Sequence, residues 1–321
     1  MYLLGSQDIG PTRYLLALDK FLKETIWFST PQTRHLLNEK QCIEKLDESK
    51  PELIVAGTSL GDTIDKKMIN YAKQIGIPSV SIIDHWSWYK KRFELNNSTT
   101  FPDYIILNDE FAKEDAIADG IPLEKIFIGG NPHLEILAEK NPSTHFNANS
   151  WKEKYDFSQN RLLLFISEEL KSTFLPDTDE YLGYNEFSVL DDLIQVLSEN
   201  DFLFIKKHPE ENQDKYNNYL SEKVLIIDDW DIEMMLQIPD FIIGMASMLL
   251  IELAIYRYDI ISYRPNAQFP FIGEKLNATH LVNNKYELQM VLQNPPKYKK
   301  LSFRNNFYGS GERIANFLNN L

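Results

Sequence analysis

One carboxylate near the start of the chain is placed to exchange a proton with a bound substrate. The apolar segment 2–4 predicts a short strand, and Gly5-Ser6-Gln7-Asp8-Ile9-Gly10 predicts the loop that leads into a helix. Asp8 would stand at the carboxyl end of the strand, where it could take a proton from a hydroxyl; the alternative is a turn aspartate that caps the helix. We expect Asp8 to be catalytic, and Gly10 and Arg13 to lie on the side that binds the sugar acceptor.

A histidine provides the second group with acid–base chemistry. The run Lys206-Lys207-His208-Pro209 follows the predicted strand 202–205, and Pro209 would end that strand. An imidazole there could donate to a leaving phosphate, with the lysines adding positive potential. The alternative is a loop histidine paired with Glu210 or Glu211. We expect His208 to be catalytic and its neighbours to bind phosphate.

A run of small residues predicts a phosphate-binding turn. The segment Gly244-Met245-Ala246-Ser247-Met248 follows the predicted strand 241–243 and opens a predicted apolar helix, 246–256. Backbone amides and Ser247 could bind an anion there. Glu252 lies on that apolar helix and needs a partner, for which a ribose diol is a candidate. The alternatives are a serine cap and a glutamate in an ion pair.

Aromatic and basic residues share one loop after the predicted strand 79–83. Aromatic faces pack on sugar rings, and basic groups meet carboxylates or phosphates. An aromatic core with a solvated basic face is the alternative. The residues expected to contact the acceptor or sugar are Asp84, His85, Trp86, Tyr89 and Arg92.

Further candidates follow other predicted strands. Thr58 and Ser59 come after strand 52–56, and Asn131 and His133 come after strand 125–128; we expect all four on the side that binds the sugar. Ser167 and Glu168 come after strand 161–166, where they could contact the base of a nucleotide. Structural or surface roles are expected for His35, His145 and His280. No spacing predicts a zinc site, no P-loop is present, and the glycine fingerprint for dinucleotides is incomplete. We therefore expect neither a metal nor a bound cofactor.

Continuous apolar strands alternating with helices predict an α/β fold with two parallel, doubly wound sheets. The pattern runs through 1–140, breaks in the polar segment 141–160 and restarts over 161–321. We predict an N-terminal Rossmann-like domain on the acceptor side, a linker, and a C-terminal Rossmann-like domain that binds a nucleotide sugar. Ligands of such folds bind at the carboxyl ends of the strands, so we expect a cleft between the domains.

Composition narrows the function classes. The chain has 321 residues, 43% of them hydrophobic and 25% charged, with a formal net charge of -14. An acidic chain disfavours nucleic acid as a partner. A single cysteine, Cys42, and no apolar run long enough to span a bilayer agree with a cytoplasmic protein. Contact with the inner face of a membrane or with an assembly complex remains open.

The order of these motifs resembles glycosyltransferases of the GT-B fold. Over nearly the whole chain, "PDYIILND", "GGNPH", "KKHP" and "GMASMLLIELA" are similar to bacterial sialyltransferase-like enzymes that use CMP-nonulosonate or CMP-Kdo. In those families an acidic motif, an HP motif and a serine motif carry the reaction. The resemblance implies that Asp8 is the general base, His208 assists the departing CMP phosphate and Ser247 holds it. Gln7 replaces one acid of the usual pair, and Met248 replaces the second serine.

Our hypothesis is an inverting, metal-independent transferase that moves a nonulosonic acid or Kdo from CMP to a surface glycan or glycolipid. The alternatives among enzymes are a UDP-sugar transferase, a UDP-N-acetylglucosamine 2-epimerase-like enzyme and a CDP-glycerol glycerophosphotransferase. A third class is a non-catalytic subunit that binds nucleotides or glycans in polysaccharide assembly. A dehydrogenase is the least favoured reading.

Overall fold

The protein is described by a computed structural model, which covers residues 1–321 except 97, 141–145, 179, 210 and 296–302. Its chain divides into two compact units. Unit 1 comprises Met1–Lys140 and Arg304–Leu321, and unit 2 comprises Asn141–Phe303. The predictions made for His145 and Glu210 lie outside the described residues.

Unit 1 is built on a seven-stranded sheet in which every neighbouring pair is parallel. In sheet order the strands are β3 (Cys42–Ile43), β2 (Thr25–Ser29), β1 (Tyr2–Ser6), β4 (Leu53–Ala56), β5 (Ser79–Ile82), β8 (Tyr104–Leu107) and β9 (Ile126–Ile128). The strands β6 (Glu94–Leu95) and β7 (Ser98–Thr99) form a separate antiparallel pair. Strand order reverses between β1 and β4, which is the point at which such sheets bind ligands.

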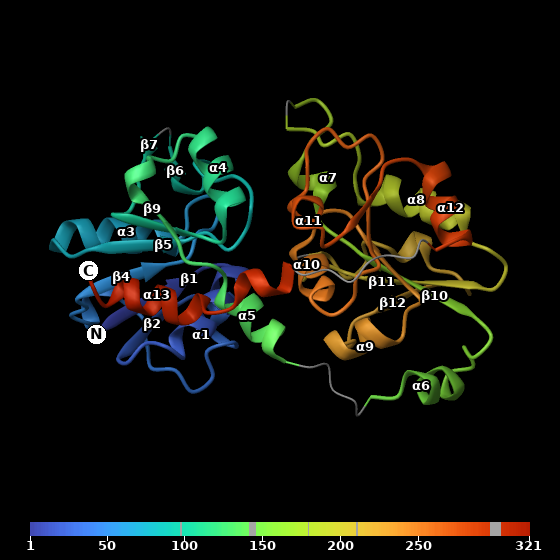
Figure 1. The fold of residues 1–321 in the computed structure, drawn as a ribbon, viewed down its shortest axis with the longest axis horizontal. Coiled ribbons are helices and arrows are strands. Elements are labelled where there is room, and N and C mark those ends of the chain that lie inside the picture. The colour runs from blue at the N-terminus through green and yellow to red at the C-terminus, as the bar shows by residue number, and fades with distance from the viewer. Residues whose placement is uncertain (97, 141–145, 179, 210, 296–302) are drawn as a thin grey trace. The chain divides into compact units, whose positions relative to one another are not determined.

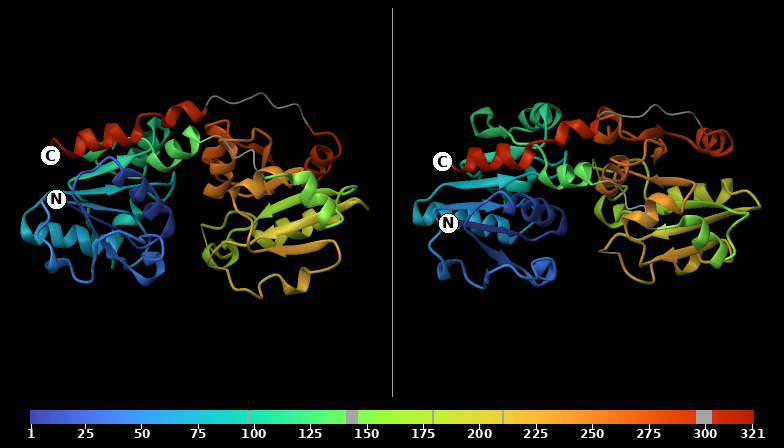
Figure 2. Two further views of the ribbon diagram at one scale, coloured as in Figure 1. Left: turned by 90° about the horizontal axis from the view of Figure 1, so that it is seen from below. Right: turned by 60° about the horizontal axis from the view of Figure 1, so that its bottom comes forward.

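Helices cover both faces of this sheet (Figures 1 and 2). The helices of unit 1 are α1 (Ile9–Asp19), α2 (Pro31–Arg34), α3 (Ile64–Ile75), α4 (Glu110–Ala118), α5 (Pro132–Glu139) and α13 (Ser310–Leu318), with the single turns η1 (Leu46–Glu48), η2 (Lys91–Phe93) and η3 (Leu123–Lys125). Helices α1, α5 and α13 pack together on one face, and α3 packs on β1, β4 and β5 from the other. Leu4, Leu15 and Ile314 are fully buried in the resulting core.

The two ends of the chain meet in unit 1. The Tyr2 hydroxyl donates to Asn319 Oδ1 at 2.6 Å, and Phe127 stacks on Phe317 of α13. The ends labelled in Figure 1 lie on this unit. The final helix therefore belongs with the N-terminal sheet, whereas the sequence pattern assigned it to the second domain.

Unit 2 repeats the architecture with a six-stranded parallel sheet. In sheet order the strands are β12 (Val224–Ile227), β11 (Asp201–Lys206), β10 (Arg161–Ile166), β13 (Phe241–Gly244), β14 (Ile260–Tyr263) and β15 (His280–Val282). Numbered along unit 2, this order is 3-2-1-4-5-6, that of a Rossmann fold, and it reverses between β10 and β13. The prediction of an α/β protein with two Rossmann-like parallel sheets is confirmed.

The helices of unit 2 also lie on both faces of their sheet (Figure 1). They are α6 (Ala148–Lys154), α7 (Leu170–Thr173), α8 (Glu186–Val196), α9 (Ile232–Gln237), α10 (Met248–Ala254), α11 (Ile272–Lys275) and α12 (Lys285–Gln293), with the single turn η4 (Asn217–Tyr219), while η5 (Phe303–Phe307) runs across the unit boundary. One core joins Phe165 and Ile205 of the sheet to Leu190 of α8 and Leu288 of α12. Because the strands are buried on both faces, they read as continuous apolar runs.

Two local predictions need correction. The segment expected to link the domains, 141–160, contains α6, whose Trp151 packs edge-on against Phe204 and Trp230 of unit 2. The glycine loop is also shorter than predicted, because Gly5 lies within β1 and Gly10 lies within α1. Aromatic packing and helix geometry thus order segments that looked like loops.

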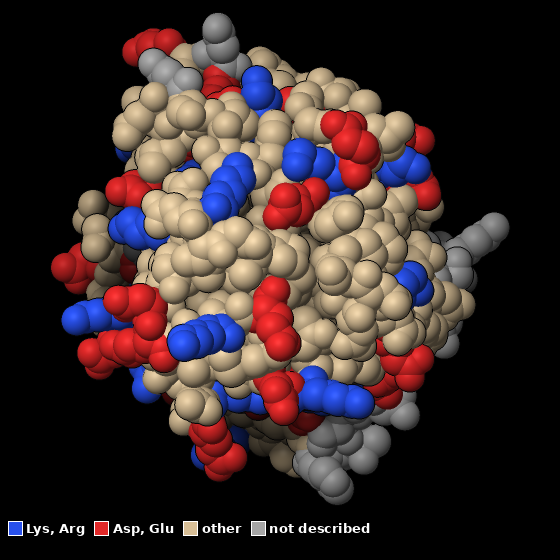
Figure 3. Space-filling model, turned by 90° about the vertical axis from the view of Figure 1, so that its left-hand side faces the viewer, with Lys and Arg blue, Asp and Glu red and all other residues tan. Residues whose placement is uncertain are grey.

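The charges on the surface and the lengths of the helices are relevant to contact with nucleic acids and membranes. On the face drawn in Figure 3, acidic and basic side chains are interspersed. No helix within the described residues is long and apolar enough to cross a membrane.

Candidate functional site

Polar residues gather at the carboxyl edge of the unit 1 sheet. A polar residue closely follows the carboxyl end of each of five strands there. These residues are Asp8 after β1, Thr58 after β4, Asp84 after β5, Asn108 after β8 and Asn131 after β9. Two of them connect directly, since Asn131 Nδ2 donates to Asn108 Oδ1 at 3.3 Å. Asn108 Nδ2 in turn donates to the Asp84 carbonyl at 3.0 Å.

The point where strand order reverses is closely packed. A Cβ added to Gly57, just after β4, would lie 2.2 Å from Ser6 Oγ at the end of β1. Only glycine therefore fits at this position unless Ser6 moves. A close backbone approach that requires glycine is thus found at Gly57, directly before Thr58 and Ser59.

Asp84 lies against the first turn of α1. A Cβ at Gly10 would lie 2.6 Å from Asp84 Oδ2, so the carboxylate approaches the backbone of that helix closely. Burial raises the pKa of Asp84 to about 6, Asp8 adds to the rise, and Arg92 and His133 oppose it. A carboxyl group in this range can both accept and donate a proton near neutral pH.

Arg92 is the cation that faces these carboxylates. Its guanidinium donates to the Ser87 carbonyl at 3.0 Å and to the Thr58 carbonyl at 2.8 Å. Burial lowers the pKa of Arg92, and Asp84 and Asp8 oppose that shift. The arginine thus ties the loop after β5 to the end of β4 and adds positive charge beside Asp84.

The expected aromatic contacts of this loop are partly wrong. Trp86 and Tyr89 are only 7% and 3% exposed, so their rings belong to the core and offer no face to a sugar. Trp86 Nε1 donates to Asp109 Oδ2 at 2.9 Å, which holds the ring inward. His85 Nδ1 pairs with Ser87 Oγ at 2.8 Å, and burial lowers the pKa of His85 to about 3. The imidazole is therefore neutral, although the sequence reading counted it as basic.

Other sugar-side predictions fall into two groups. Thr58, Ser59 and Asn131 are buried, and the Thr58 hydroxyl donates to the Ile82 carbonyl at 2.9 Å. Asn131 caps α5 by accepting the amides of His133 and Leu134. Exposed or half-exposed positions at this end are Gly10, Arg13, His133 and Asp8.

The carboxyl edge of unit 2 carries the second cluster. Ser167 and Glu168 follow β10, His208 follows β11, and Ala246 follows β13. Across the reversal of strand order, Glu168 Oε2 accepts the backbone amide of Ala246 at 2.7 Å. The small-residue turn predicted to bind phosphate is thus occupied by a carboxylate of the same unit.

The environment of Glu168 favours its neutral form. Burial raises the pKa of Glu168 to about 7, while the Ala246 amide and Arg264 oppose the rise. Glu186 and Glu211 add to it through their negative charge. Arg264, which follows β14, is 2% exposed and donates to the Phe269 carbonyl at 2.7 Å. Arg264 was not among the predicted residues.

A buried ionic network supports the histidine loop. Lys215 Nζ lies 2.6 Å from Glu211 Oε1 and 2.5 Å from Glu186 Oε1, and both carboxylates are almost fully buried. Glu211 Oε2 accepts the His208 amide at 2.9 Å, and Glu211 Oε1 accepts from the Ser167 hydroxyl at 2.7 Å. Glu211 therefore ties the loop after β11 to the end of β10. The sequence reading considered Glu211 only as a partner of the histidine ring, and it gave Lys215 no role.

The remaining unit 2 candidates have local partners. Lys207 Nζ pairs with Asp228 Oδ1 at 3.5 Å, and Lys206 Nζ reaches the Asp228 carbonyl at the same distance. Ser247 caps α10 by accepting the Leu249 amide at 3.2 Å. Pro209 is exposed, and Glu252 is half-buried on α10.

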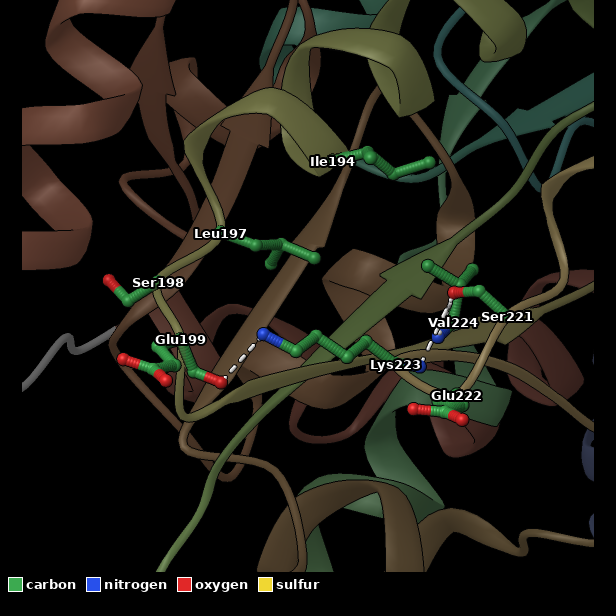
Figure 4. A pocket seen from close by; sticks show the side chains of 8 residues that line it. All are labelled: Ile194, Leu197, Ser198, Glu199, Ser221, Glu222, Lys223 and Val224. Atoms are coloured by element: carbon green, nitrogen blue, oxygen red, sulfur yellow. Dashed lines mark hydrogen bonds between the residues drawn. The ribbon is translucent and has the colours of Figure 1, made fainter.

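A pocket at the opposite edge of unit 2 lacks these features. It lies between the end of α8 and the start of β12, and Figure 4 shows Lys223 donating to the Glu199 carbonyl across it, at 2.7 Å. Parallel sheets bind ligands at their carboxyl ends, whereas this pocket lies where β12 begins. Within the described parts of the chain, no three His, Cys, Asp or Glu side chains are grouped to hold a metal.

Comparison with known proteins identifies the fold and leaves the family open. No family model matches the chain, and no curated protein matches it. The fold is of the GT-B type. A UDP-GlcNAc 2-epimerase from Methanocaldococcus jannaschii is similar with a TM-score of 0.62 and 16% identity, covering 100% of both chains. S. aureus MnaA with UDP has a TM-score of 0.69 and 13% identity, covering 100% of this chain and 97% of that one. Anabaena HepE with UDP-glucose has a TM-score of 0.65 and 14% identity over 100% of both chains.

Proposed function

We propose that this protein is an enzyme acting on a UDP-linked sugar, with inversion of carbon 2 of the sugar as its reaction. The observation that carries the proposal is the carboxyl edge of unit 2. There the small-residue turn 244–247 lies beside Glu168 where the strand order reverses, as in nucleotide-binding sheets. The fold likeness supports it, because the similar structures include complexes with UDP, UDP-GlcNAc and UDP-glucose.

In this proposal unit 2 binds the nucleotide. Backbone amides of the turn 244–247 would face the diphosphate, and Glu252 would bind the ribose hydroxyls. His208 would donate a hydrogen bond to the phosphate as negative charge develops on it. Ser167 would contact the base side of the nucleotide, whereas Glu168 would release the Ala246 amide to the diphosphate. The CMP donor expected from the motif resemblance gains no support from the comparisons, so uridine replaces cytidine as the preferred base.

The proton chemistry is assigned to unit 1. In the proposed reaction the carbon 2 proton and the UDP on carbon 1 leave together, which forms a double bond between carbons 1 and 2. UDP then adds back to carbon 1 while a proton reaches the opposite face of carbon 2. Asp84, with its pKa raised to about 6, is suited to hold a proton part of the time near neutral pH. Arg92 would stabilise the deprotonated, negatively charged form of Asp84. The proposal requires no metal and no bound cofactor.

The test is proton exchange in heavy water. UDP-GlcNAc is incubated with the protein in D₂O, and the carbon 2 proton signal is followed by NMR. An epimerase replaces that proton with deuterium and forms the second epimer without any acceptor. Asp84→Asn should slow the exchange by about 10²-fold or more. Glu124→Gln, which changes an exposed carboxylate of unit 1, is the matched control.

Sugar transfer is the second candidate, and one feature favours it. Asp8 precedes α1 at the carboxyl end of β1 and lies in the electrostatic surroundings of Asp84. A base in this position could deprotonate an acceptor hydroxyl. Tight UDP-sugar binding without deuterium exchange, together with hydrolysis or transfer that requires Asp8, would replace the epimerase proposal with this one. Binding without any turnover would favour the non-catalytic subunit.

A further inference from the structure

Trp88 adopts a backbone conformation that bulky residues avoid. Its φ is +58°, in the left-handed region, where a side chain clashes with the following carbonyl. The other described non-glycine residues with positive φ are Asn96, Asp156, Asn266 and Asn277. Those residue types tolerate the region, because their short polar side chains bond locally. Trp88 is the exception in both size and chemistry.

Hydrogen bonds on both sides keep Trp88 in this conformation. The Arg92 amide donates to the Trp88 carbonyl at 3.2 Å, and Arg92 Nε donates to the carbonyl of Ser87 at 3.0 Å. The Lys90 amide donates to Asp119 Oδ2 at 2.8 Å. Arg92 is in turn bonded to the end of β4 and faces Asp84. The loop therefore imposes the strain on Trp88 from the carboxyl edge of the sheet.

Burial of the Trp88 side chain does not offset this strain. Trp86, Tyr89 and Phe93 of the same loop are buried, whereas Trp88 stays half-exposed. Lys91 Nζ lies 4.6 Å from the centre of the Trp88 ring, which places a cation beside this half-exposed ring. Strained residues of this kind concentrate at ligand-binding positions, where the conformation presents a side chain to the ligand.

We propose that Trp88 is a carbohydrate-binding platform on which the pyranose ring of a sugar substrate stacks. The apolar C–H face of a pyranose matches a broad aromatic ring, and sugar hydroxyls around it can bond to Lys91 and to polar residues of the loop. The inference rests on the proposed function for the class of its ligand. The pyranose belongs either to the nucleotide sugar or to a separate sugar acceptor, and the test distinguishes these sources.

The experiment compares three variants of Trp88. Trp88→Phe retains an aromatic ring, while Trp88→Ala and Trp88→Gly both remove it. Tyr155→Ala is the matched control, because Tyr155 is an exposed ring with Lys154 Nζ 5.0 Å from its centre, and it follows α6 in unit 2. Calorimetry measures affinity for UDP, for UDP-GlcNAc and for free N-acetylglucosamine, the last with and without saturating UDP.

The expected result separates ring from backbone. Trp88→Ala and Trp88→Gly should lose about 5- to 10-fold in sugar affinity, and Trp88→Phe should stay within about twofold. UDP affinity should stay the same in all variants. If the variants lose affinity for UDP-GlcNAc but not for UDP, the ligand of Trp88 is the donor sugar. If they lose affinity only for free N-acetylglucosamine, the ligand is an acceptor sugar. Trp88→Gly should also melt about 2–4 °C above Trp88→Ala, because only glycine relieves the positive φ.

The opposite results are equally clear. Equal sugar affinity in Trp88→Gly, Trp88→Phe and the wild type would overturn the platform. So would an equal loss in Tyr155→Ala. A wild type that binds no UDP would overturn the proposed function instead, and the free-sugar titration without UDP would still decide on Trp88.

Discussion

Glu168 Oε2 accepts the backbone amide of Ala246 at 2.7 Å, across the point where the strand order of unit 2 reverses. The carboxylate therefore occupies a donor that a bound phosphate would use. Its pKa is raised to about 7, so the group changes charge within the physiological range. Protonation of Glu168 would remove a negative charge from the place where the diphosphate is proposed to bind.

Binding of UDP-GlcNAc should consequently weaken as the pH rises. Below pH 7 most Glu168 is neutral and repels phosphate little, whereas above pH 7 the charged form competes for the Ala246 amide. Between pH 6 and pH 8 we expect affinity to fall by about tenfold. UDP-GlcNAc suits this calorimetric titration because its diphosphate has no terminal group that titrates near neutral pH.

Glu168→Gln should remove this pH dependence and bind at pH 8 about as tightly as the wild type binds at pH 6. Glu169→Gln, which changes the next residue along the chain, should leave the dependence intact. If Glu168→Gln instead weakens binding at every pH, the carboxylate contacts the nucleotide directly and does not compete with it.

Asp84 should make unit 1 less stable as the pH rises through 6. Its pKa is raised from the ordinary value of 3.8 to about 6 in the folded protein, mainly by burial. The folded state thus holds the proton more tightly, and the stability gained is full below about pH 4 and lost as the pH passes 6. Urea unfolding between pH 4 and pH 7.5, monitored by fluorescence, should show the free energy of unfolding falling over this window.

Asp84→Asn should flatten that fall, and Glu124→Gln should not. Glu168 contributes a change of the same sign near pH 7 from unit 2, so the comparison is made between variants and not on the absolute curve. A slope that Asp84→Asn leaves unaltered would mean that Asp84 titrates normally in the folded protein.

The strands that the sequence predicted best are those buried on both faces. Residues 161–166 were predicted with the bounds that the structure gives, because a long apolar run flanked by polar residues is typical of a buried strand. Strands β2 (Thr25–Ser29) and β3 (Cys42–Ile43) were missed, since β2 is only partly buried and β3 has two residues. β2 pairs with β1 and β3 pairs with β2, so both strands form only as part of the whole sheet.

The positions of candidate site residues were predictable where they depend only on the residue following a strand. Asp84 follows a strand of unit 1, and His208 and Ala246 follow strands of unit 2. Each parallel sheet brings such positions to its own carboxyl edge. The role of Lys215 was hidden, because it arises from pairing with Glu186, which is 29 residues away along the sequence and adjacent only after folding. The burial of Trp86 was hidden for the same reason, since it depends on Asp109 at the end of another strand.

Lys215 should be critical for the stability of unit 2. Its ammonium group is the cation paired with the buried carboxylates of Glu186 and Glu211. Lys215→Met would leave both charges without this partner and should lower the free energy of unfolding by about 3–5 kcal/mol, whereas Lys215→Arg should cost much less. Urea denaturation at pH 7.5 measures both. Adding Glu211→Gln to Lys215→Met should recover part of the loss, and a double variant no better than Lys215→Met would contradict the pairing.

Glu211 should affect catalysis through the position of His208. Its carboxylate accepts the His208 amide at 2.9 Å and so fixes the backbone of the loop. His208→Ala should lower turnover by about 10²-fold or more, because it removes a donor to the leaving phosphate. Glu211→Gln retains an oxygen acceptor for the amide and should lower turnover less than Glu211→Ala. Steady-state kinetics with UDP-GlcNAc, read for kcat and KM separately, provide the measurement. If kcat falls most in His208→Ala, less in Glu211→Ala and least in Glu211→Gln, with stability measured alongside, Glu211 is the residue that positions the histidine. Wild-type turnover in His208→Ala would instead remove the imidazole from the reaction and leave Glu211 with a purely structural role.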